Sequence, residues 1–358
     1  MKVTAIETYV LEVPASHQMA LQYPLHRYVV VQVRTDEGID GLGYSLLFNG
    51  LGDRPVYDCV QILVPIVIGR DPTLVHDAWQ AMYATQVSAE LRRPLAYAIS
   101  ALDIALWDIV GKVAELPLAR LWGAPSLAVD CYGSGGWAPY SVSDLVAEAE
   151  RYTALGCAYY KLKAHDPDPH ANRARVEAVA TALGSGVRLM VDLNQRGTVE
   201  SNRELAAALA GLDMFWYEEP VPAGDIAACA EVARSIDIAV ATGENNLTCA
   251  EFAELIEQRA ARYLMPDVCR AHGFTETLRI GELAAEAGVQ VAPHLIPELS
   301  AHVVAALPSG FLVEFMDWAP PDLFEDSPGC VRGQLTVTDR PGHGVALVPT
   351  AIEKYRVK

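Results

Sequence analysis

The sequence predicts an α/β protein: a (β/α)8-type barrel of the modified TIM-barrel kind, joined to an α+β capping domain. Three observations predict this fold. The chain has 358 residues, 51% of them hydrophobic, which is enough to bury more than one core. From about residue 126 onward, short apolar segments alternate with Ala-rich helical segments, a pattern typical of parallel strands joined by helices. The residues before 126 lack this alternation, so we expect them to form a separate domain.

The first domain, residues 1–125, is expected to be α+β. Alternating apolar and polar residues predict an antiparallel meander, and helical periodicity follows until proline and glycine residues near 117–125 mark a boundary. The expected strands are Val3–Val13, Tyr28–Arg34 and a third ending near Phe48. The expected helices run from an Asp53 cap to Ile68, from Asp71-Pro72-Thr73 onward, and from Pro94 to Val113.

The barrel domain is expected over residues 126–320, because eight separate βα units favour a closed barrel over an open sheet. The eight expected strands are Ala128–Tyr132, Ala158–Lys163, Val187–Asp192, Met214–Glu218, Ile238–Thr242, Tyr263–Met265, Val289–Pro293 and Phe311–Glu314. In the tail, residues 321–358, Gln334–Thr338 and Val345–Val348 resemble a hairpin around Pro341-Gly342. We expect this tail to return to the first domain.

Composition excludes several classes of protein. The formal net charge is −18, and an acidic surface repels nucleic-acid phosphates and anionic membranes. No apolar run reaches the roughly 18–20 residues of a membrane span, and the N-terminus lacks the features of a signal peptide. We therefore expect a cytoplasmic protein without nucleic-acid or membrane partners. Seven cysteines without a C-x-x-C pair predict buried free thiols, and neither a disulfide framework nor a thiolate zinc site.

Carboxylates recur at the C-terminal ends of successive predicted strands. Asp192, Glu218 and Glu244 follow three neighbouring strands at intervals of one βα unit. In a barrel these positions face one rim, where barrel enzymes place their active sites. Any one of them alone could be a helix cap, but carboxylates gathered on one rim need a cation between them. Their hard oxygens suit Mg²⁺, with Mn²⁺ as a substitute.

Two basic constellations accompany the carboxylates. Lys161 and Lys163 lie two residues apart on one strand, so both side chains point to the same face. Two close cations are expected to lower each other's pKa, which would allow one lysine to act as a base. Asp267 and His294 end the sixth and seventh strands, where the carboxylate can orient the imidazole as an acid or base.

Two further polar residues are candidate contacts for a substrate. Glu314 ends the eighth predicted strand, and Asn194 is expected to share a strand face with Asp192. A divalent cation with two ammonium groups would hold a carboxylate substrate, and Lys163 or His294 could remove the proton α to it. Positive charge placed at the substrate carboxylate stabilises the resulting ene-diolate.

These residues give the chain a resemblance to the mandelate racemase subgroup of the enolase superfamily. The motifs that carry it are Lys161-Leu162-Lys163, Val191-Asp192-Leu193-Asn194, Tyr217-Glu218-Glu219-Pro220, Gly243-Glu244-Asn245, Met265-Pro266-Asp267, His294 with Glu298–His302, and Glu314. The resemblance implies metal ligands at Asp192, Glu218 and Glu244, and bases at Lys163 and at His294 paired with Asp267. It further implies carboxylate contacts from Lys161 and Glu314, a lid over the pocket near Ala15–Arg27, and a homo-oligomer.

The expected lid suggests the substrate class. It is polar, and Arg92 and Arg93 are candidates to approach the same site; the polar lid residues are His17, Gln18, Gln22, Tyr23 and His26. Polar lids fit polyols, so the expected reaction is dehydration of a hydroxylated (sugar) acid to a 2-keto-3-deoxy acid. A racemase or epimerase of a 2-hydroxy acid would use the same two bases and stays open. A non-catalytic ligand-binding barrel is the third alternative.

Overall fold

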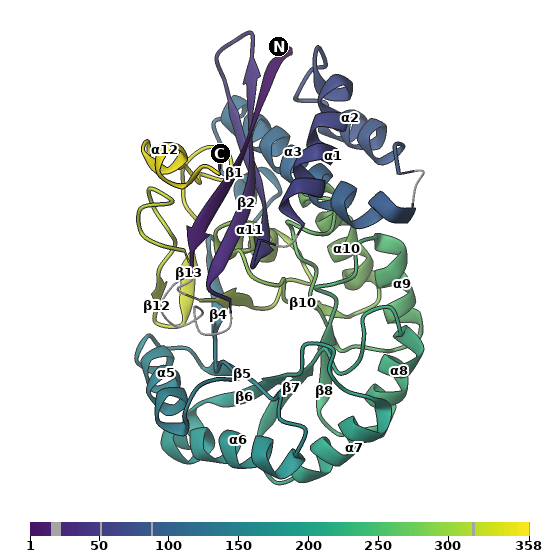
Figure 1. The fold of residues 1–358 in the computed structure, drawn as a ribbon, viewed down its shortest axis with the longest axis vertical. Coiled ribbons are helices and arrows are strands. Elements are labelled where there is room, and N and C mark those ends of the chain that lie inside the picture. The colour runs from purple at the N-terminus through teal and green to yellow at the C-terminus, as the bar shows by residue number, and fades with distance from the viewer. Residues whose placement is uncertain (16–22, 51, 87–88, 317–318, 358) are drawn as a thin grey trace.

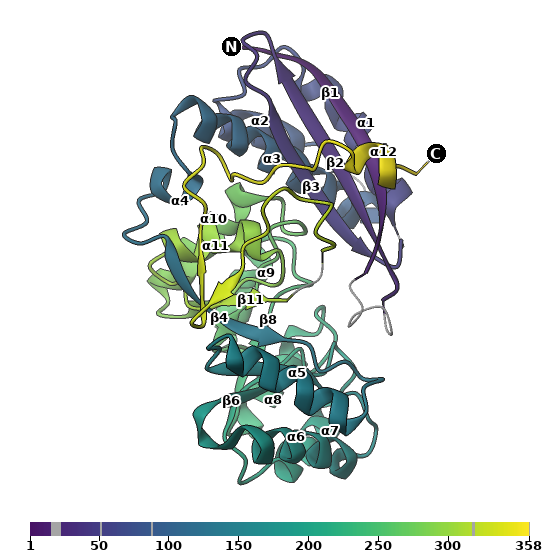
Figure 2. The ribbon, with the colours of Figure 1, turned by 90° about the vertical axis from the view of Figure 1, so that its left-hand side faces the viewer.

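The computed structural model describes residues 1–15, 23–50, 52–86, 89–316 and 319–357. It consists of an α+β domain placed above a closed barrel, with the C-terminal segment running between them (Figures 1 and 2). This architecture confirms the predicted fold class.

The capping domain is a three-stranded antiparallel sheet covered by helices. The strands β1 (Val3–Pro14), β2 (Leu25–Thr35) and β3 (Gly41–Phe48) pair in that order. The helices are α1 (Asp53–Val67), α2 (Val75–Tyr83), η2 (Ala89–Leu91) and α3 (Arg92–Val113). Gly41 and Gly43 let β3 lie directly on α3, since a Cβ at either would fall 2.1 or 2.0 Å from a helix carbonyl oxygen.

Two helix starts differ from the sequence prediction. Asp53 lies within the first turn of α1, and the capping position belongs to Gly52. The second helix starts at Val75 rather than at Asp71-Pro72-Thr73. The side-chain oxygen of Asp71 accepts hydrogen bonds from the Thr73 amide (2.9 Å) and hydroxyl (2.7 Å), which makes this segment a turn before the helix.

Helix α3 is the central helix of the capping domain. Contrary to the sequence expectation, it is long and apolar enough to cross a membrane, the one such helix among the described residues, but 78% of its apolar window is buried inside the protein. It packs against α1, α2, β2 and β3. This packing accounts for its apolar composition.

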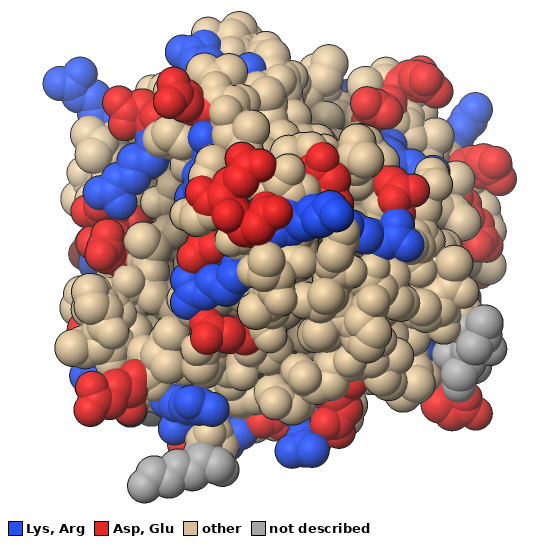
Figure 3. Space-filling model, turned by 90° about the horizontal axis from the view of Figure 1, so that it is seen from above, with Lys and Arg blue, Asp and Glu red and all other residues tan. Residues whose placement is uncertain are grey.

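The face of the molecule on the capping-domain side carries both signs of charge. Lys and Arg side chains lie beside Asp and Glu in this view (Figure 3). Ion pairs of the capping domain include Arg34 with Glu7 at 2.8 Å and Arg70 with Asp77 at 2.5 Å. Some of the acidic side chains of this domain are therefore paired with basic ones.

All eight predicted barrel strands are present, within a few residues of the expected bounds. They are β4 (Ala128–Ser134), β5 (Tyr159–Lys163), β6 (Arg188–Asp192), β7 (Met214–Glu218), β8 (Ala239–Thr242), β9 (Tyr263–Leu264), β10 (Gln290–Val291) and β11 (Val313–Phe315). Neighbours pair in parallel, β11 returns to pair with β4, and a bridge from Val291 to Gly310 closes the ring. The helices between and around them are α4 (Leu118–Leu121), α5 (Val142–Ala154), α6 (Pro169–Leu183), η3 (Gly184–Gly186), α7 (Val199–Ala208), α8 (Ile226–Ser235), α9 (Cys249–Glu257), α10 (Phe274–Glu286) and α11 (Pro297–Ala306).

Apolar side chains, large and small, fill the inside of the barrel below the polar rim. Seven of the eight strands or their flanks contribute to this buried cluster, which includes Tyr132, Met190, Trp216, Ala241, Met265, Ala292 and Leu312. The interior is thus a packed core, as expected for eight strands. It also supports the rim, because the Trp216 indole N–H donates to Glu218 Oε2 at 3.0 Å.

The C-terminal tail binds both domains, but it does not form the predicted hairpin. Strand β12 (Cys330–Val331) pairs with β13 (Gln334–Thr336), which continues the barrel sheet antiparallel to β4. Residues 345–348 lie elsewhere, with Leu347 bridged to Phe324. The tail then rises along the capping domain (Figure 2) and ends in α12 (Ala351–Tyr355), and Arg356 bridges to Leu11 of β1.

Gly342 explains why the predicted hairpin is wrong. At φ +79° it passes directly over α3, where a Cβ on Gly111 would lie 2.5 Å from the Gly342 Cα atom. The Gly342 amide donates a hydrogen bond to the Leu116 carbonyl oxygen, and the Gly342 carbonyl oxygen accepts one from the Leu118 amide. Pro341-Gly342 therefore marks a crossing of two chain segments and not a turn between paired strands.

Candidate active site

The rim of the barrel brings the predicted site residues together. A cavity of about 240 Å3 opens there, between the barrel and Tyr23 and Phe48 of the capping domain. Five predicted residues line it: Lys163, Asn194, Glu244, His294 and Glu314. The other four, Lys161, Asp192, Glu218 and Asp267, are buried next to them.

Both lysines are held by carboxylates of neighbouring strands. Lys161 Nζ lies 2.5 Å from Glu218 Oε1 and 2.9 Å from Glu314 Oε1. Lys163 Nζ contacts Asp192 Oδ2, the residue opposite it in the β5–β6 register. The same-face placement expected for the two lysines therefore holds, and both ammonium groups are buried.

The expected lowering of the lysine pKa values is wrong for this arrangement. Burial lowers the pKa of each ammonium group, and Lys161 also lowers that of Lys163. The carboxylates outweigh both effects, because Glu218 and Glu314 raise the pKa of Lys161 well above its usual value, and Asp192 raises that of Lys163. At both lysines the carboxylates at contact distance together favour the protonated amine more than burial disfavours it.

Asp267 and His294 form the expected pair. His294 Nδ1 lies 2.7 Å from Asp267 Oδ2, and His294 Nε2 lies 3.4 Å from Glu244 Oε2. The Cys269 amide donates to the other oxygen of Asp267 at 2.7 Å. Such an anchored carboxylate fixes the orientation of the imidazole and leaves Nε2 on the cavity side.

Glu314 and Asn194 are fixed by local hydrogen bonds. Glu314 Oε2 accepts from the Leu295 amide at 2.9 Å, and although burial opposes it, Lys161 and His294 lower the pKa of Glu314 below its usual value. The sequence predicts that Asn194 shares a strand face with Asp192, but Asn194 lies in a left-handed turn after β6 (φ 44°). Its amide donates to Asp192 Oδ1 at 2.8 Å, so it orients that carboxylate as well as lining the cavity.

Arg270 is a site residue to which the sequence analysis gave no role. Its guanidinium lies 3.2 Å from Glu244 Oε1 and 3.0 Å from Asp267 Oδ2, and it lines the cavity. It therefore links a predicted metal ligand to the Asp267–His294 pair. The signal in the sequence is its place three residues after Asp267 in a polar loop.

Glu219 and Asn245 were also missed as site residues. Glu219 is 1% exposed, and burial, reinforced by Glu244 and Asp192, raises its pKa to about 8. Asn245 donates its side-chain amide to Glu219 Oε1 at 2.8 Å. Each directly follows a predicted ligand in the sequence, which is the signal that could have found them.

The acidic residues of the rim fit a divalent cation by their donor chemistry. Asp192, Glu218 and Glu244 are 0%, 0% and 6% exposed, and Mg²⁺ prefers carboxylate oxygens. Their oxygens are not all within 4.8 Å of one another among the described residues, since Glu218 contacts Lys161 and Glu244 contacts Arg270. Carboxyl groups nevertheless outnumber the cationic side chains; the rim holds Asp192, Glu218, Glu219, Glu244, Asp267 and Glu314 against Lys161, Lys163 and Arg270.

The predicted lid is described only in part. His17, Gln18 and Gln22 lie outside the described residues. Tyr23 does lie over the cavity, with its ring 5.8 Å from that of Trp137. His26 does not line it, because its side chain is buried against Phe48, and burial lowers its pKa to about 4.

Neither predicted arginine lines the cavity. Arg92 pairs with Glu251 at 3.0 Å on the surface. Arg93 donates to the backbone carbonyl of Asn245 at 3.0 Å, so it supports the wall of the cavity from outside.

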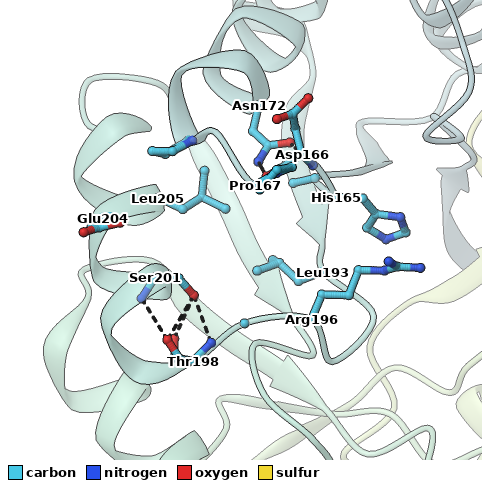
Figure 4. A pocket seen from close by; sticks show the side chains of 13 residues that line it. His165, Asp166, Pro167, Asn172, Leu193, Arg196, Thr198, Ser201, Glu204 and Leu205 are labelled. Carbon is cyan, nitrogen blue, oxygen red and sulfur yellow. Dashed lines mark hydrogen bonds between the residues drawn. The ribbon is translucent and has the colours of Figure 1, made fainter.

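A larger cavity of about 450 Å3 lies beside the site, between α6 and α7 (Figure 4). Thr198 and Ser201 on its wall bond to each other as the cap of α7. His165 lies on the side of this cavity nearest the rim, and its Nε2 is 3.0 Å from Asn194 Oδ1. Burial lowers the pKa of His165 to about 4, so this imidazole is neutral at pH 7.

An α+β domain over a (β/α)8 barrel, with carboxylates, two lysines and an Asp–His pair on the rim, defines the class of enolase-superfamily enzymes. Comparison with known families agrees. The family model described as "Enolase C-terminal domain-like" matches residues 144–351. The model described as "Mandelate racemase / muconate lactonizing enzyme, N-terminal domain" matches residues 5–123. The chain belongs to the mandelate racemase/muconate lactonizing enzyme family, which confirms the resemblance.

Individual relatives cover nearly the whole chain. L-talarate/galactarate dehydratase of Salmonella typhimurium LT2 is 31% identical over 320 residues, 89% of this chain and 80% of that protein. A racemase from Streptomyces coelicolor A3(2) with bound magnesium has a TM-score of 0.94 at 28% identity, covering 99% of this chain and 100% of its own. L-talarate dehydratase from Polaromonas sp. JS666, complexed with Mg and L-glucarate, has a TM-score of 0.91 at 32% identity. The match covers 100% of this chain and 98% of that one.

Proposed function

We propose that the protein is a Mg²⁺-dependent acid-sugar dehydratase. It would remove the proton α to the carboxylate of a hydroxylated acid and expel the β-hydroxide, which gives a 2-keto-3-deoxy acid. The observation that carries the proposal is one cavity lined by Lys163, His294 and Glu314. A single bound acid would there meet two proton-transfer groups and a charged contact.

The acidic residues of the rim are proposed to bind the metal. Asp192, Glu218 and Glu244 would hold Mg²⁺ through their carboxylate oxygens. When bound, the ion supplies positive charge that stabilises the substrate carboxylate as it gains a second negative charge. Lys161, whose ammonium lies between Glu218 and Glu314, adds fixed positive charge to the same region.

The proton transfers are proposed for two groups on different sides of the cavity. Strands β5 and β10 are separated around the barrel by β4 and β11, so Lys163 and His294 would address different faces of a bound carbon. One takes the α proton and the other delivers a proton to the departing hydroxide. Asp267 keeps His294 in the orientation that this role needs.

Relatives support a hydroxylated substrate. L-talarate/galactarate dehydratase is the relative at 31% identity, and L-glucarate is the ligand of the Polaromonas structure. The racemase from Streptomyces coelicolor favours a second candidate, racemisation or epimerisation of a 2-hydroxy acid, in which the second base returns the proton to the opposite face. The oriented Asp267–His294 pair argues against a non-catalytic binding barrel.

The two reactions can be separated by a substrate panel. The metal-free protein is loaded with Mg²⁺ and incubated with acid sugars in deuterated water. A 2-keto product detected with semicarbazide supports dehydration, whereas C2 deuterium with an inverted centre and no keto product supports racemisation. Lys163→Ala and His294→Asn should each abolish the reaction. Neither product nor exchange with any acid, from folded and Mg²⁺-bound protein, would contradict both.

Other features stay predictions. We propose the division into residues 1–125, 126–320 and 321–358, a homo-oligomer, and a cytoplasmic location without nucleic-acid or membrane partners.

A further inference from the structure

Three cysteines that are far apart in the sequence meet below the barrel rim. Cys131 lies on β4, Cys157 precedes β5, and Cys330 lies on β12 of the tail. The sequence predicts buried free thiols and no thiolate zinc site, because no two cysteines form a C-x-x-C pair. The fold instead brings together thiols separated by 26 and 173 residues, because both β5 and the β12–β13 hairpin pair with β4.

The thiols are close enough to share one ion. The three sulfur atoms all lie within 4.8 Å of one another, with Cys131 Sγ to Cys330 Sγ at 3.4 Å and Cys157 Sγ to Cys330 Sγ at 3.7 Å. Around a tetrahedral ion with metal–sulfur bonds of about 2.3 Å, ligand sulfurs lie about 3.8 Å apart. The observed separations are near this value, and the side chains are 2%, 2% and 5% exposed.

We propose that Cys131, Cys157 and Cys330 form a binding site for a thiophilic divalent cation such as Zn²⁺. Three S–H bonds would be replaced by three S–metal bonds, and three protons would leave to solvent. Thiolates are soft ligands that select such ions over Mg²⁺. The ion would therefore not compete with the carboxylate site on the rim.

The bound site would carry a small net charge. Three thiolates and one divalent ion leave a net charge of −1, and the Arg151 guanidinium is near enough to Cys157 to interact favourably with that charge. The cluster lies close to the molecular surface, since Val331 next to Cys330 on the short β12–β13 hairpin is 68% exposed. Opening of this hairpin would admit the ion.

Ion binding would fasten the tail to the barrel. The hairpin that carries Cys330 leads into the segment that reaches the capping domain, whereas Cys131 and Cys157 belong to the barrel. An ion that binds the folded chain but not the unfolded one stabilises it. The site would thus add a clamp between the two parts, independent of the proposed reaction.

The test uses Cd²⁺ as a spectroscopic probe of the full chain, reduced and kept in Mg²⁺. The expected result is one Cd²⁺ per chain with a thiolate-to-cadmium charge-transfer band in the ultraviolet and a raised melting temperature. Cys330→Ser should lose both effects. Cys229→Ser is the matched control, because this buried thiol donates to the Ala260 carbonyl and does not belong to the cluster, so its loss should leave both effects unchanged.

A measurement on the unsubstituted protein tests the proposal even if Cys330→Ser does not fold. X-ray absorption at the cadmium edge should show three sulfur neighbours. A shell of oxygen alone, or a band that persists in folded Cys330→Ser, would overturn the proposal. A mass lower by two hydrogen atoms in unreduced protein, placed at Cys131 and Cys330, would instead show a disulfide and would also overturn it.

Discussion

Asp267 is shared between a base and a cation. It accepts a hydrogen bond from His294 and pairs with Arg270, which also contacts Glu244. Replacing Asp267 by Asn keeps the shape but removes the charge that orients and strengthens His294. We expect roughly a 10²–10⁴-fold loss in kcat/KM for the keto product, with the melting temperature little changed. Exposed Asp168→Asn is the control, and an unaltered rate in Asp267→Asn would argue against the pair.

Substitution of Glu218 tests the proposed metal site. Its carboxylate is fully buried beside Lys161, so Glu218→Gln removes a negative charge that no solvent replaces. We expect the affinity for Mg²⁺ to fall by at least about tenfold, since Mg²⁺ depends on a few carboxylates, as measured by titration calorimetry. Glu298→Gln, at a carboxylate bonded to Tyr44, should bind Mg²⁺ as the parent does. Undiminished affinity in Glu218→Gln would remove this residue from the ligand set.

Residue types and spacing allowed much of the candidate site to be predicted, but not its charge pairing. The carboxylates could be found because parallel strands end on one rim. The contacts of Lys161, Lys163 and Arg270 could not, because each depends on side-chain positions from neighbouring strands. For the same reason the pKa values of the lysines move opposite to expectation. The cysteine cluster could not be predicted, because Cys330 joins Cys131 and Cys157 only through the packing of the tail.

At the scale of elements, a buried carboxylate joins the capping domain to the barrel. Asp103 of α3 accepts hydrogen bonds from the Thr275 hydroxyl (2.6 Å) and amide (3.0 Å) at the start of α10. Burial raises its pKa from 3.8 to about 7. The folded state therefore keeps this proton at pH values where the unfolded state has lost it. Its contribution to stability must then decrease as pH rises from about 4 to 7.

The expected decrease in stability with rising pH can be tested by replacing Asp103. Asp103→Asn should reduce the fall of the unfolding free energy between pH 4 and 7, by up to about 4 kcal/mol for a pKa raised from 3.8 to about 7. Urea unfolding of both proteins at a series of pH values measures it. Asp36→Asn, at an exposed turn, should keep the parent's slope. Parallel curves for Asp103→Asn and the parent would show that Asp103 is ionised in the folded protein.

Elements were predicted well where burial controls them. The barrel strands are buried and short, and their apolar runs stand out between helices. The tail hairpin was wrong because Pro341-Gly342 has the composition of a turn but serves a close crossing. Local residue patterns cannot distinguish the two, since the partner of the crossing is α3, more than 200 positions earlier.

At the scale of the molecule, the tail, the capping sheet and α3 meet at one buried charge. Asp108 accepts hydrogen bonds from the Leu42 amide (3.0 Å), the Lys112 ammonium (2.7 Å) and the His343 amide (3.3 Å). His343 Nε2 lies 2.7 Å from the Leu42 carbonyl oxygen. The tail therefore stabilises the capping domain from within, and its crossing over α3 is the place to test that coupling.

Gly111 provides the test, because the usual effect of its substitution is known. In an exposed helix, Gly→Ala stabilises by up to about 1 kcal/mol. Here the added Cβ would lie 2.5 Å from Gly342 Cα and 3.0 Å from the Leu116 carbonyl oxygen, so the tail must move away. We expect Gly111→Ala to lower the unfolding free energy by about 1–3 kcal/mol, measured by urea unfolding. Gly186→Ala has no atom within 4 Å of its Cβ and should be neutral or slightly stabilising. A gain in stability from Gly111→Ala would mean that the tail does not rest on α3 in solution.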